Sequence, residues 1–382
     1  MKRLVISIDP GFDAAKIVIN KRQYKYPFAV EDITEELDKF PLQRTDNSFV
    51  LCKMDGRTYL VGEYARRSLL ETEHLEEAKV DMDNFYTTGR FKTNLFKVGF
   101  FAFMGMALYD YAQETKDISI DDINNCELFV GVALPHEFCD ILWKTCIKDL
   151  LAEDHKFILD IGNNKNIKFD LILKENNCVY NSQAICALID MVCNDDGNMI
   201  EKDKTIMDYL PAIVIDAGYK TLGKFKLSRD GRMDKAESNT LFAMNNINEQ
   251  VSAKIREKVP NIYPYMIEDL YKNNESVYYE EDGEVKYFNI KKMRDEITKQ
   301  KAIQLMEYLR RQHNNLLDVK LILLAGGTGA AYFDTINEYC SKRINLKDKV
   351  WLAKSGFDGA ECDPVFAISI GLYKAMALHF DF

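Results

Sequence analysis

The chain has 382 residues, of which 47% are hydrophobic and 29% are charged, and its formal net charge at pH 7 is −10. This length exceeds one average domain and the composition is that of a globular protein, so two domains or two lobes are expected. The acidic balance argues against a general affinity for nucleic acid, because phosphate contacts need clustered Lys and Arg side chains.

The cysteines and the apolar runs bear on the cellular compartment. Nine cysteines are scattered without a C-x-x-C pair, which favours small buried hydrophobes in a reducing cytoplasm and no zinc site. The apolar run at 4–8 is too short for a secretory signal. The run at 95–111 contains Lys97 and Asp110 and falls short of the roughly 20 apolar residues of a membrane span. We therefore expect a cytoplasmic protein without membrane contact, and a buried helix in this region.

The first half of the chain opens with a strand, a turn and a strand at 4–19, LVISIDPGFDAAKIVI. The elements expected after it are, in chain order, a hairpin at 48–61 around an Asp55-Gly56 turn, a charged helix at 62–78, an apolar helix at 93–113, a strand at 127–134, an amphipathic helix at 137–151, strands at 156–161 and 167–173, and a strand at 179–180.

The second half repeats this beginning with a strand, a turn and a strand at 213–227, IVIDAGYKTLGKFKL. The elements expected after it are an amphipathic helix at 246–259, a polar and aromatic insert at 260–290, a long helix at 291–315, a strand at 320–327 and a mostly buried C-terminal helix at 364–378. Two halves that begin alike and continue into mixed α/β structure indicate a duplicated lobe.

The repeated turn predicts a site for phosphate and Mg²⁺. In each copy an Asp ends a buried strand and a Gly follows in the turn, so backbone can approach a ligand closely. Asp9 and Asp216 would hold Mg²⁺ through water, and Lys16 would neutralise charge. The β- and γ-phosphates would be bound by backbone N–H groups near Gly11, Phe12 and Asp13 in the first turn, and near Gly218, Tyr219, Lys220 and Thr221 in the second.

With these turns, the segments LLAGGTGAAYFD at 323–334 and DPVFAISIGLY at 363–373 resemble the actin-like ATPase superfamily. The segments GVALPHEF at 131, ILDIGNNKNIKFDLI and FDGAECDPVFAISIGLY are most similar to the ParM-type plasmid-segregation actins. The resemblance implies an α/β actin-like fold of two lobes, with a duplicated ribonuclease-H-like core and a nucleotide in the interlobe cleft.

The resemblance also implies domain boundaries. Lobe I would span 1–185, with a core at 1–20 and 93–185 and a small insert at 20–92, and the C-terminal helix at 363–382 would complete it. Lobe II would span 186–362, with a core at 186–235 and 291–362 and a small insert at 236–290.

Further site residues follow from the resemblance alone. Gln183, in VYNSQAICALID, stands where the family carries its water-orienting Gln or Glu. Gly326, Gly327 and Thr328 match the adenosine motif, and Lys254 lies on the helix that borders adenine and ribose in actins. The second turn departs from the family, because Tyr219-Lys220-Thr221 follows Gly218 where many relatives have Gly-Gly-Thr after the Asp.

Two motifs compete with this interpretation. The segment ILDIGNNKNIKF at 158–169 imitates the phosphate turn, but we assign it to a structural hairpin because the family places one there. The glycines at 326–329 could instead belong to a dinucleotide fingerprint, yet G-x-G-x-x-G would need Gly at Tyr332.

The function implied is an ATPase that forms dynamic filaments for plasmid DNA segregation, with hydrolysis triggering disassembly. Its cofactors would be ATP or GTP and Mg²⁺, and its partners other copies of itself and a DNA-binding adaptor protein at a centromere-like site. The main alternative is a monomeric sugar- or acetate-kinase-like phosphotransferase, for which Gln183 would be a poor base. A chaperone ATPase would need a peptide-binding domain after the last helix, and a membrane-tethered relative would need a terminal amphipathic helix.

Overall fold

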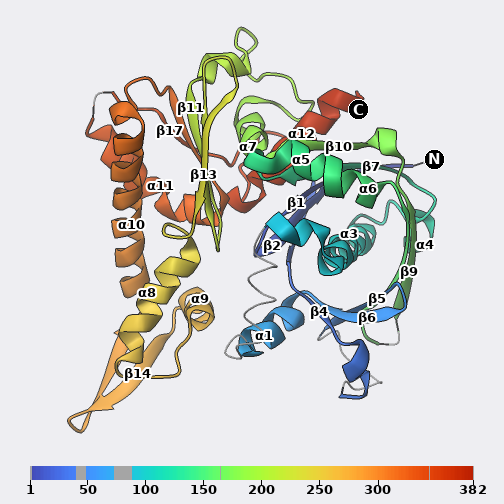
Figure 1. Cartoon of the computed structure of the whole chain (residues 1–382), viewed down its shortest axis with the longest axis horizontal. Coiled ribbons are helices and arrows are strands. Elements are labelled where there is room, and N and C mark those ends of the chain that lie inside the picture. The colour runs from blue at the N-terminus through green and yellow to red at the C-terminus, as the bar shows by residue number, and fades with distance from the viewer. Residues whose placement is uncertain (1, 40–48, 73–87, 164, 344, 382) are drawn as a thin grey trace. The chain divides into compact units, whose positions relative to one another are not determined.

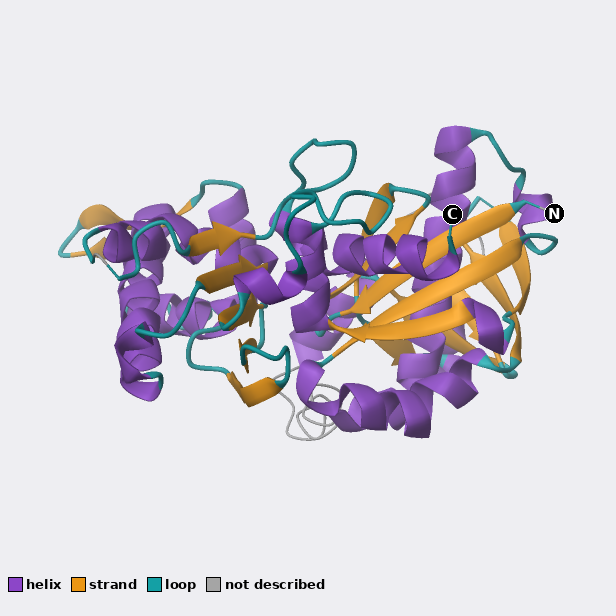
Figure 2. Cartoon of the chain, turned by 90° about the horizontal axis from the view of Figure 1, so that it is seen from above, coloured by secondary structure: helices purple, strands orange, loops and turns teal. Residues whose placement is uncertain are grey.

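A computed structural model describes residues 2–39, 49–72, 88–163, 165–343 and 345–381 (Figure 1). The chain forms two compact units. The first unit comprises Met1–Asn198, Gly356–Glu361 and Ile368–Phe382, and the second comprises Met199–Ser355 and Cys362–Ala367. Both ends of the described chain belong to the first unit (Figure 2), where the ring of Phe380 packs 4.9 Å from that of Phe129.

The main sheet of the first unit is built on the predicted N-terminal hairpin. Its strands have the order β10-β7-β1-β2-β3. They are β1 (Arg3–Pro10), β2 (Ala14–Ile19), β3 (Arg22–Pro27), β7 (Glu127–Leu134) and β10 (Cys178–Ser182). Three strands form an antiparallel meander, and β7 and β10 then add in parallel to β1. The predicted strands at 127–134 and 179–180 are confirmed.

The sheet of the second unit repeats this topology strand for strand. Its order is β13-β12-β11-β16-β17. The strands are β11 (Ala212–Ala217), β12 (Leu222–Leu227), β13 (Met233–Asn239), β16 (Leu321–Ala325) and β17 (Val350–Leu352). Again three strands form an antiparallel meander and two more add in parallel. The duplication predicted from the two Ile-Asp runs is therefore a duplication of whole sheets.

A second sheet of the first unit has the order β4-β6-β5-β8-β9. Its strands are β4 (Val30–Asp32), β5 (Val50–Met54), β6 (Arg57–Val61), β8 (Asp154–Asp160) and β9 (Asn166–Ile172). The tight turn between β5 and β6 has positive φ at Asp55 and Gly56, which Asp-Gly accommodates well. The structural hairpin predicted for 158–169 is β8–β9, and it pairs with β5 rather than with the main sheet.

The predicted apolar helix is α3 (Asn94–Thr115), and it forms the centre of the first unit's core. Thr93 caps its N-terminus by accepting a hydrogen bond from the Phe96 N–H. The helix contacts strands of both sheets, and Gly105 allows the backbone to approach Phe157. Within the described residues, no helix is both long and apolar enough to cross a membrane.

The remaining elements are helices, one separate hairpin and short 3₁₀ turns. The helices are α1 (Glu63–Thr72), α4 (Ile120–Ile123), α5 (Cys139–Leu142), α6 (Lys148–Leu151), α7 (Gln183–Val192), α8 (Met244–Arg256), α9 (Pro264–Lys272), α10 (Ile290–Gln312), α11 (Gly326–Ser341) and α12 (Ala367–Phe380), and a separate hairpin is formed by β14 (Ser276–Glu281) and β15 (Glu284–Asn289). Short 3₁₀ turns lie at 34–39, 88–92, 136–138, 175–177, 206–209, 314–316 and 364–366.

Three sequence predictions need adjustment. The helix expected at 137–151 contains a π-helical turn, Trp143–Ile147, between α5 and α6. The strand expected at 320–327 ends at Ala325, because Gly326 has a positive φ and starts α11. The charged helix expected at 62–78 is described only to Thr72, so the rest of that prediction, like residue 48 of the predicted hairpin, lies outside the described residues.

Candidate functional site

The first turn, Asp9 to Asp13, brings three predicted residues together. Asp9 is the last residue but one of β1 and is only 1% exposed. Lys16, its partner in the register with β2, places Nζ 3.1 Å from Oδ2. Gln183, the first residue of α7, donates a hydrogen bond from Nε2 to the other carboxylate oxygen over 2.9 Å. A carboxylate held by a cation and an amide is fixed in orientation as well as in charge.

Gly11 is required by the space that this arrangement leaves. A Cβ atom on Gly11 would lie 2.5 Å from Lys16 Nζ and 2.9 Å from the Ala14 carbonyl oxygen. The Gly11 N–H donates to the Asp9 carbonyl over 3.0 Å, so the chain folds back tightly. Asp13 is fixed by its own carbonyl, which accepts the Phe28 N–H over 2.9 Å. The first turn is therefore a compact and well-supported structure.

The side chain of Arg90 supports the first turn, and it was not predicted from the sequence. Its guanidinium is almost fully buried, at 2% exposure, and donates to the backbone carbonyls of Pro10 and Gly11. Its central carbon also lies 4.1 Å from the ring centroid of Phe12 and 4.9 Å from that of Phe91. One guanidinium therefore fixes the orientation of two successive carbonyl groups in the first turn. Because Arg90 is far from the turn in the sequence, no local motif signals it.

The N-terminus of α7 is anchored to β7 through a histidine. Ser182 caps α7 by accepting the Ile185 N–H over 3.2 Å, and its hydroxyl also shares a hydrogen bond with Nδ1 of His136. Burial lowers the pKa of His136, which favours the neutral imidazole. These contacts fix the helix end that carries Gln183. The sequence did not predict a site role for His136, which lies in the segment GVALPHEF.

The second turn, Asp216 to Thr221, is tied to the start of α11. The Gly218 N–H donates to the Thr221 carbonyl over 2.9 Å, which closes the turn. The Gly218 carbonyl accepts a hydrogen bond from Thr328 Oγ1 over 2.8 Å, so the predicted phosphate and adenosine motifs meet in this unit. The Tyr219 carbonyl accepts the Asn245 N–H over 2.8 Å, which connects the turn to α8.

The paired glycines allow α11 to begin against the second turn. A Cβ atom on Gly326 would lie 2.6 Å from the Ala217 carbonyl oxygen and 3.3 Å from Asp216 Oδ1. Gly326 also has a φ of +80°, which side chains other than glycine rarely adopt. Gly327 packs close to Val365, where a Cβ would lie 3.3 Å from Cγ1.

The two remaining predicted lysines are arranged differently. Lys220 lies within the second turn and is half-buried. Lys254 lies on the exposed side of α8, next to the buried Ile255, and takes no part in the hydrogen bonds described for the turn. Its assignment to the base and ribose therefore still depends on the resemblance alone.

The side chains around the two turns suit a hydrated metal ion better than a directly bound one. Across the described ranges, no group of three or more His, Cys, Asp or Glu side chains is gathered as a direct metal site. Asp9 already engages both carboxylate oxygens with Lys16 and Gln183, so a cation bound without water would have to displace one of them. A hydrated Mg²⁺ fits this arrangement, because Mg²⁺ retains several waters and needs only one or two carboxylates beside phosphate oxygens.

Comparisons with known proteins identify the fold. No family model matches the sequence, and no curated protein sequence matches it. Among solved structures, the chain is similar to the ParM of a 15-stranded filament from Clostridium botulinum, with 16% identity, a TM-score of 0.62 and coverage of 98% of this chain and 99% of that one.

Two further structures agree. The actin-like protein Alp7A has 14% identity, a TM-score of 0.64 and coverage of 99% and 97%. Ta0583, an archaeal actin homolog, has 15% identity, a TM-score of 0.63 and coverage of 97% and 98%. The chain therefore has the actin-like fold over its full length, as its sequence motifs predicted.

Proposed function

We propose that this actin-like chain is an ATPase that polymerises into dynamic filaments for the segregation of plasmid DNA. ATP and Mg²⁺ would promote assembly, and hydrolysis would trigger disassembly. The observation that carries the proposal is the duplicated sheet. In each unit the central strand of the same five-stranded topology has an Asp as its last residue but one, Asp9 or Asp216, and a turn with Gly follows the strand.

Each turn offers groups suited to phosphate. Backbone N–H groups of Gly11 to Asp13 and of Gly218 to Thr221 would donate to phosphate oxygens. Lys16, held beside Asp9, would neutralise negative charge, and Lys220 would do so from the second turn. Arg90 would keep the first turn in the conformation that presents these donors, because it fixes the carbonyls of Pro10 and Gly11.

Asp9 and Asp216 would hold Mg²⁺ through water. When bound, the ion would neutralise charge on the phosphate oxygens. The remaining nucleotide contacts in the proposal are the backbone of Gly326 and Gly327 and the hydroxyl of Thr328, with Lys254 beside the base. The close approach of Gly326 to the second turn supports this assignment, since the absence of a side chain lets the start of α11 lie directly beside Ala217 and Asp216.

Gln183 is proposed to orient the attacking water. Its Nε2 donates to Asp9, so the amide is held in one orientation and its Oε1 is available to accept a hydrogen bond from water. Such a residue acts by positioning, and an amide is a poor general base. The hydrolysis would then depend on the geometry of Gln183 more than on its basicity.

Assembly and cargo are proposed from the fold and from the net charge. The similarity to a ParM filament structure supports self-association of this fold. The acidic net charge of −10 fits a filament that reaches its DNA through a DNA-binding adaptor protein, without direct contact to nucleic acid. We place the protein in the cytoplasm because its nine cysteines are scattered without a C-x-x-C pair, which favours a reducing compartment.

The enzymatic part can be tested with Asp9→Asn and Asp216→Asn. Phosphate release from ATP and from GTP, measured with and without Mg²⁺, should fall by about 100-fold or more in both variants. Asp160→Asn is the matched control, because Asp160 stands in the β8–β9 hairpin that imitates the motif and should retain wild-type turnover. Wild-type turnover in both Asp9→Asn and Asp216→Asn would contradict the proposed site.

A further inference from the structure

The β14–β15 hairpin exposes an aromatic and aliphatic face. Tyr278 is 67% exposed, Tyr287 is 60% exposed and Val285 is 75% exposed. Tyr278 and Tyr287 are directly opposite one another in the register, with ring centroids 5.9 Å apart. The three side chains lie on one face of the hairpin, because the residue facing Val285 is Glu280, two positions after Tyr278. Exposed aromatic groups of this kind mark interaction surfaces.

The opposite face holds the hairpin in place. Val277 is buried in the core of the second unit, and Phe288 packs against the same core. Glu281 accepts a hydrogen bond from Lys258, in the turn that follows α8, and another from Lys286 Nζ over 2.8 Å. A two-stranded hairpin alone is marginally stable in water, so this anchorage is what keeps the exposed face in a fixed orientation. The hairpin reaches past α8 and α9 (Figure 1).

The tip of the hairpin is strongly acidic. Glu280, Glu281 and Glu284 surround the Asp282-Gly283 turn. Glu280 and Glu284 are exposed. A partner for this tip must therefore combine positive charge with an apolar surface for the tyrosines.

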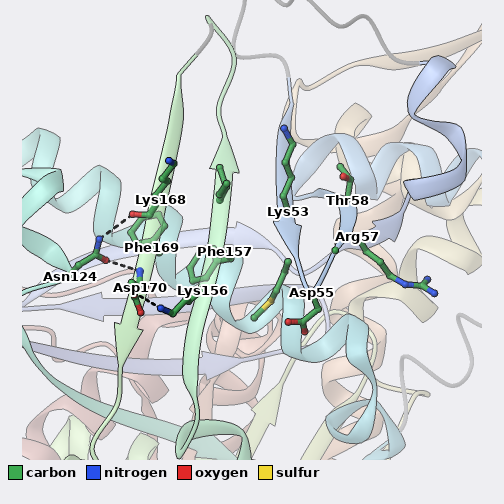
Figure 3. A pocket seen from close by; sticks show the side chains of 13 residues that line it. Lys53, Asp55, Arg57, Thr58, Asn124, Lys156, Phe157, Lys168, Phe169 and Asp170 are labelled. Carbon is green, nitrogen blue, oxygen red and sulfur yellow. Dashed lines mark hydrogen bonds and ion pairs between the residues drawn. The ribbon is translucent and has the colours of Figure 1, made fainter.

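A groove of about 540 Å³ on the second sheet of the first unit has that character (Figure 3). Lys53 of β5, Ile158 of β8 and Lys168 of β9 lie in one register row, so two exposed lysines flank an apolar side chain. Both lysines line the groove. They stand out as local positive charge on a chain whose formal net charge is −10.

The edge of this sheet is blocked, which leaves its face for docking. Asn124 Nδ2 donates to the Lys168 carbonyl over 3.2 Å, and its Oδ1 accepts the Asp170 N–H over 2.9 Å. These bonds occupy backbone groups of β9 that an added strand would need. Lys156 and Asp170 pair across the same face at 2.9 Å and leave Lys53 and Lys168 as the exposed charges beside Ile158.

We propose that the acidic, aromatic hairpin of one copy docks on the lysine-lined groove of a second copy. The proposal rests on the proposed function, since it names a contact for the self-assembly. The two surfaces differ, so the contact is heterologous, and a heterologous contact that does not close into a ring extends into an open filament. Complementary charge would set the register, and burial of Tyr278 and Tyr287 would supply contact area.

Charge reversal on each side gives a decisive test. Glu280→Lys/Glu284→Lys is the hairpin variant, and Lys53→Glu/Lys168→Glu is the groove variant. Each should fail to sediment with ATP and Mg²⁺ under conditions in which the wild type sediments, because like charges then meet at every contact. A one-to-one mixture should sediment, since reversed hairpins meet reversed grooves and the remaining contacts are wild type.

The control is Asp334→Lys/Glu338→Lys, which makes the same charge change on exposed positions of α11. It should sediment alone like the wild type, because its hairpin and groove are unchanged, and when mixed with the groove variant it should leave the groove variant in the supernatant. Wild-type sedimentation of either reversed variant alone, or a mixture of the two that stays in the supernatant, would overturn the docking proposal. Phosphate release is measured in the same samples. If the wild type hydrolyses ATP without sedimenting, the filament proposal itself fails and the docking proposal fails with it.

Discussion

Gln183 is the residue that most directly separates binding from chemistry. It contacts Asp9 through a single hydrogen bond of 2.9 Å, while backbone groups of the first turn and Lys16 provide the groups assigned to phosphate. A change at Gln183 therefore leaves most proposed ground-state contacts in place. The transition state, in contrast, would lose an oriented water.

We expect Gln183→Ala to bind ATP with nearly wild-type affinity and to hydrolyse it at least about 10-fold more slowly. Nucleotide titration and single-turnover phosphate release on the same preparation check this. An affinity that falls in proportion to the rate would instead make Gln183 a structural part of the pocket.

Arg90 offers a second test at the scale of one side chain. Arg90→Lys keeps a positive charge but loses the planar fork that spans two carbonyls, and Arg90→Met loses both. Both variants should unfold more easily, because hydrogen bonds to a charged donor contribute about 1.5–3 kcal/mol each. Both should also bind ATP at least about 10-fold more weakly, with Arg90→Lys the milder. Lower melting temperatures with wild-type affinity would limit Arg90 to a folding role.

His155 makes the stability of the first unit depend on pH. It is 1% exposed and its ring lies 3.6 Å from that of Phe101. Burial, and secondarily the charge of Lys97, lower its pKa from 6.5 to about 4. In the unfolded chain, His155 binds a proton as the pH falls below about 6.5, whereas in the folded chain it stays neutral until about pH 4. Its contribution to the free energy of unfolding is therefore complete above pH 6.5 and is lost as the pH falls from 6.5 to 4.

Between pH 7 and pH 5, the protonation of His155 should remove about 2 kcal/mol from the free energy of unfolding. Urea unfolding at the two pH values checks this. His155→Phe should show a shallower loss than the wild type, whereas the exposed His379→Gln should keep the wild-type slope. An equal slope in His155→Phe would show that other groups control the pH dependence.

At the scale of elements, α7 and α12 are packed unusually closely within the first unit. Lys374 of α12 is buried and bonds through Nζ to the backbone carbonyl of Asp190 over 2.9 Å and to its Oδ1 over 3.2 Å. Gly371 lets the two helices approach, since a Cβ there would lie 1.8 Å from the Cys186 carbonyl oxygen. The close approach of the helices and the buried Lys374–Asp190 ion pair depend on each other, because separating the helices would leave each buried charge without its partner.

Gly371→Ala should therefore destabilise the protein by about 3 kcal/mol or more, despite the better helix propensity of alanine. Gly329→Ala in α11 is the matched control, because its Cβ would find its nearest neighbour at 3.5 Å. That variant should be neutral or up to about 1 kcal/mol more stable. Thermal unfolding of both variants measures this difference. Equal melting temperatures would mean that α12 can move away from α7 with little loss of stability.

The elements also show what sequence reasoning can reach. The two central hairpins were predictable because β-branched runs, an Asp and a Gly recur in order at 4–19 and 213–227. The resemblance implied roles for Gln183 and Thr328, but their hydrogen bonds to Asp9 and to the Gly218 carbonyl were not predicted from the sequence. The role of Arg90 could not be predicted, because a contact between residues far apart in the sequence produces no local pattern.

Other features were missed for different physical reasons. The exposed hairpin inside 260–290 has apolar residues on both faces, so the alternation that normally identifies a half-buried strand is absent there. The pairing of β8 with β5 is a long-range contact that local patterns do not specify. The end of β16 was misplaced by two residues, because the fold takes Gly326 and Gly327 into the next helix.

At the scale of the whole molecule, the proposed function requires that bound ATP favours the conformation that assembles into filaments. Hydrolysis to ADP must then make that conformation less favourable. A ligand can shift this equilibrium only by its differential affinity for the two states. Filaments of Gln183→Ala should therefore outlast those of the wild type, because their bound ATP persists. Asp216→Ala should form few filaments or none.

The most direct measurement is a time course of sedimentation after addition of ATP and Mg²⁺, with negative-stain electron microscopy of the pellets. At protein concentrations of tens of micromolar, on the order of weak association constants, the wild type should pellet as filaments and return to the supernatant as phosphate is released. Gln183→Ala should remain in the pellet, and ADP should produce no pellet. A wild-type chain that hydrolyses ATP yet never pellets with ATP or GTP would contradict the account and favour a monomeric phosphotransferase.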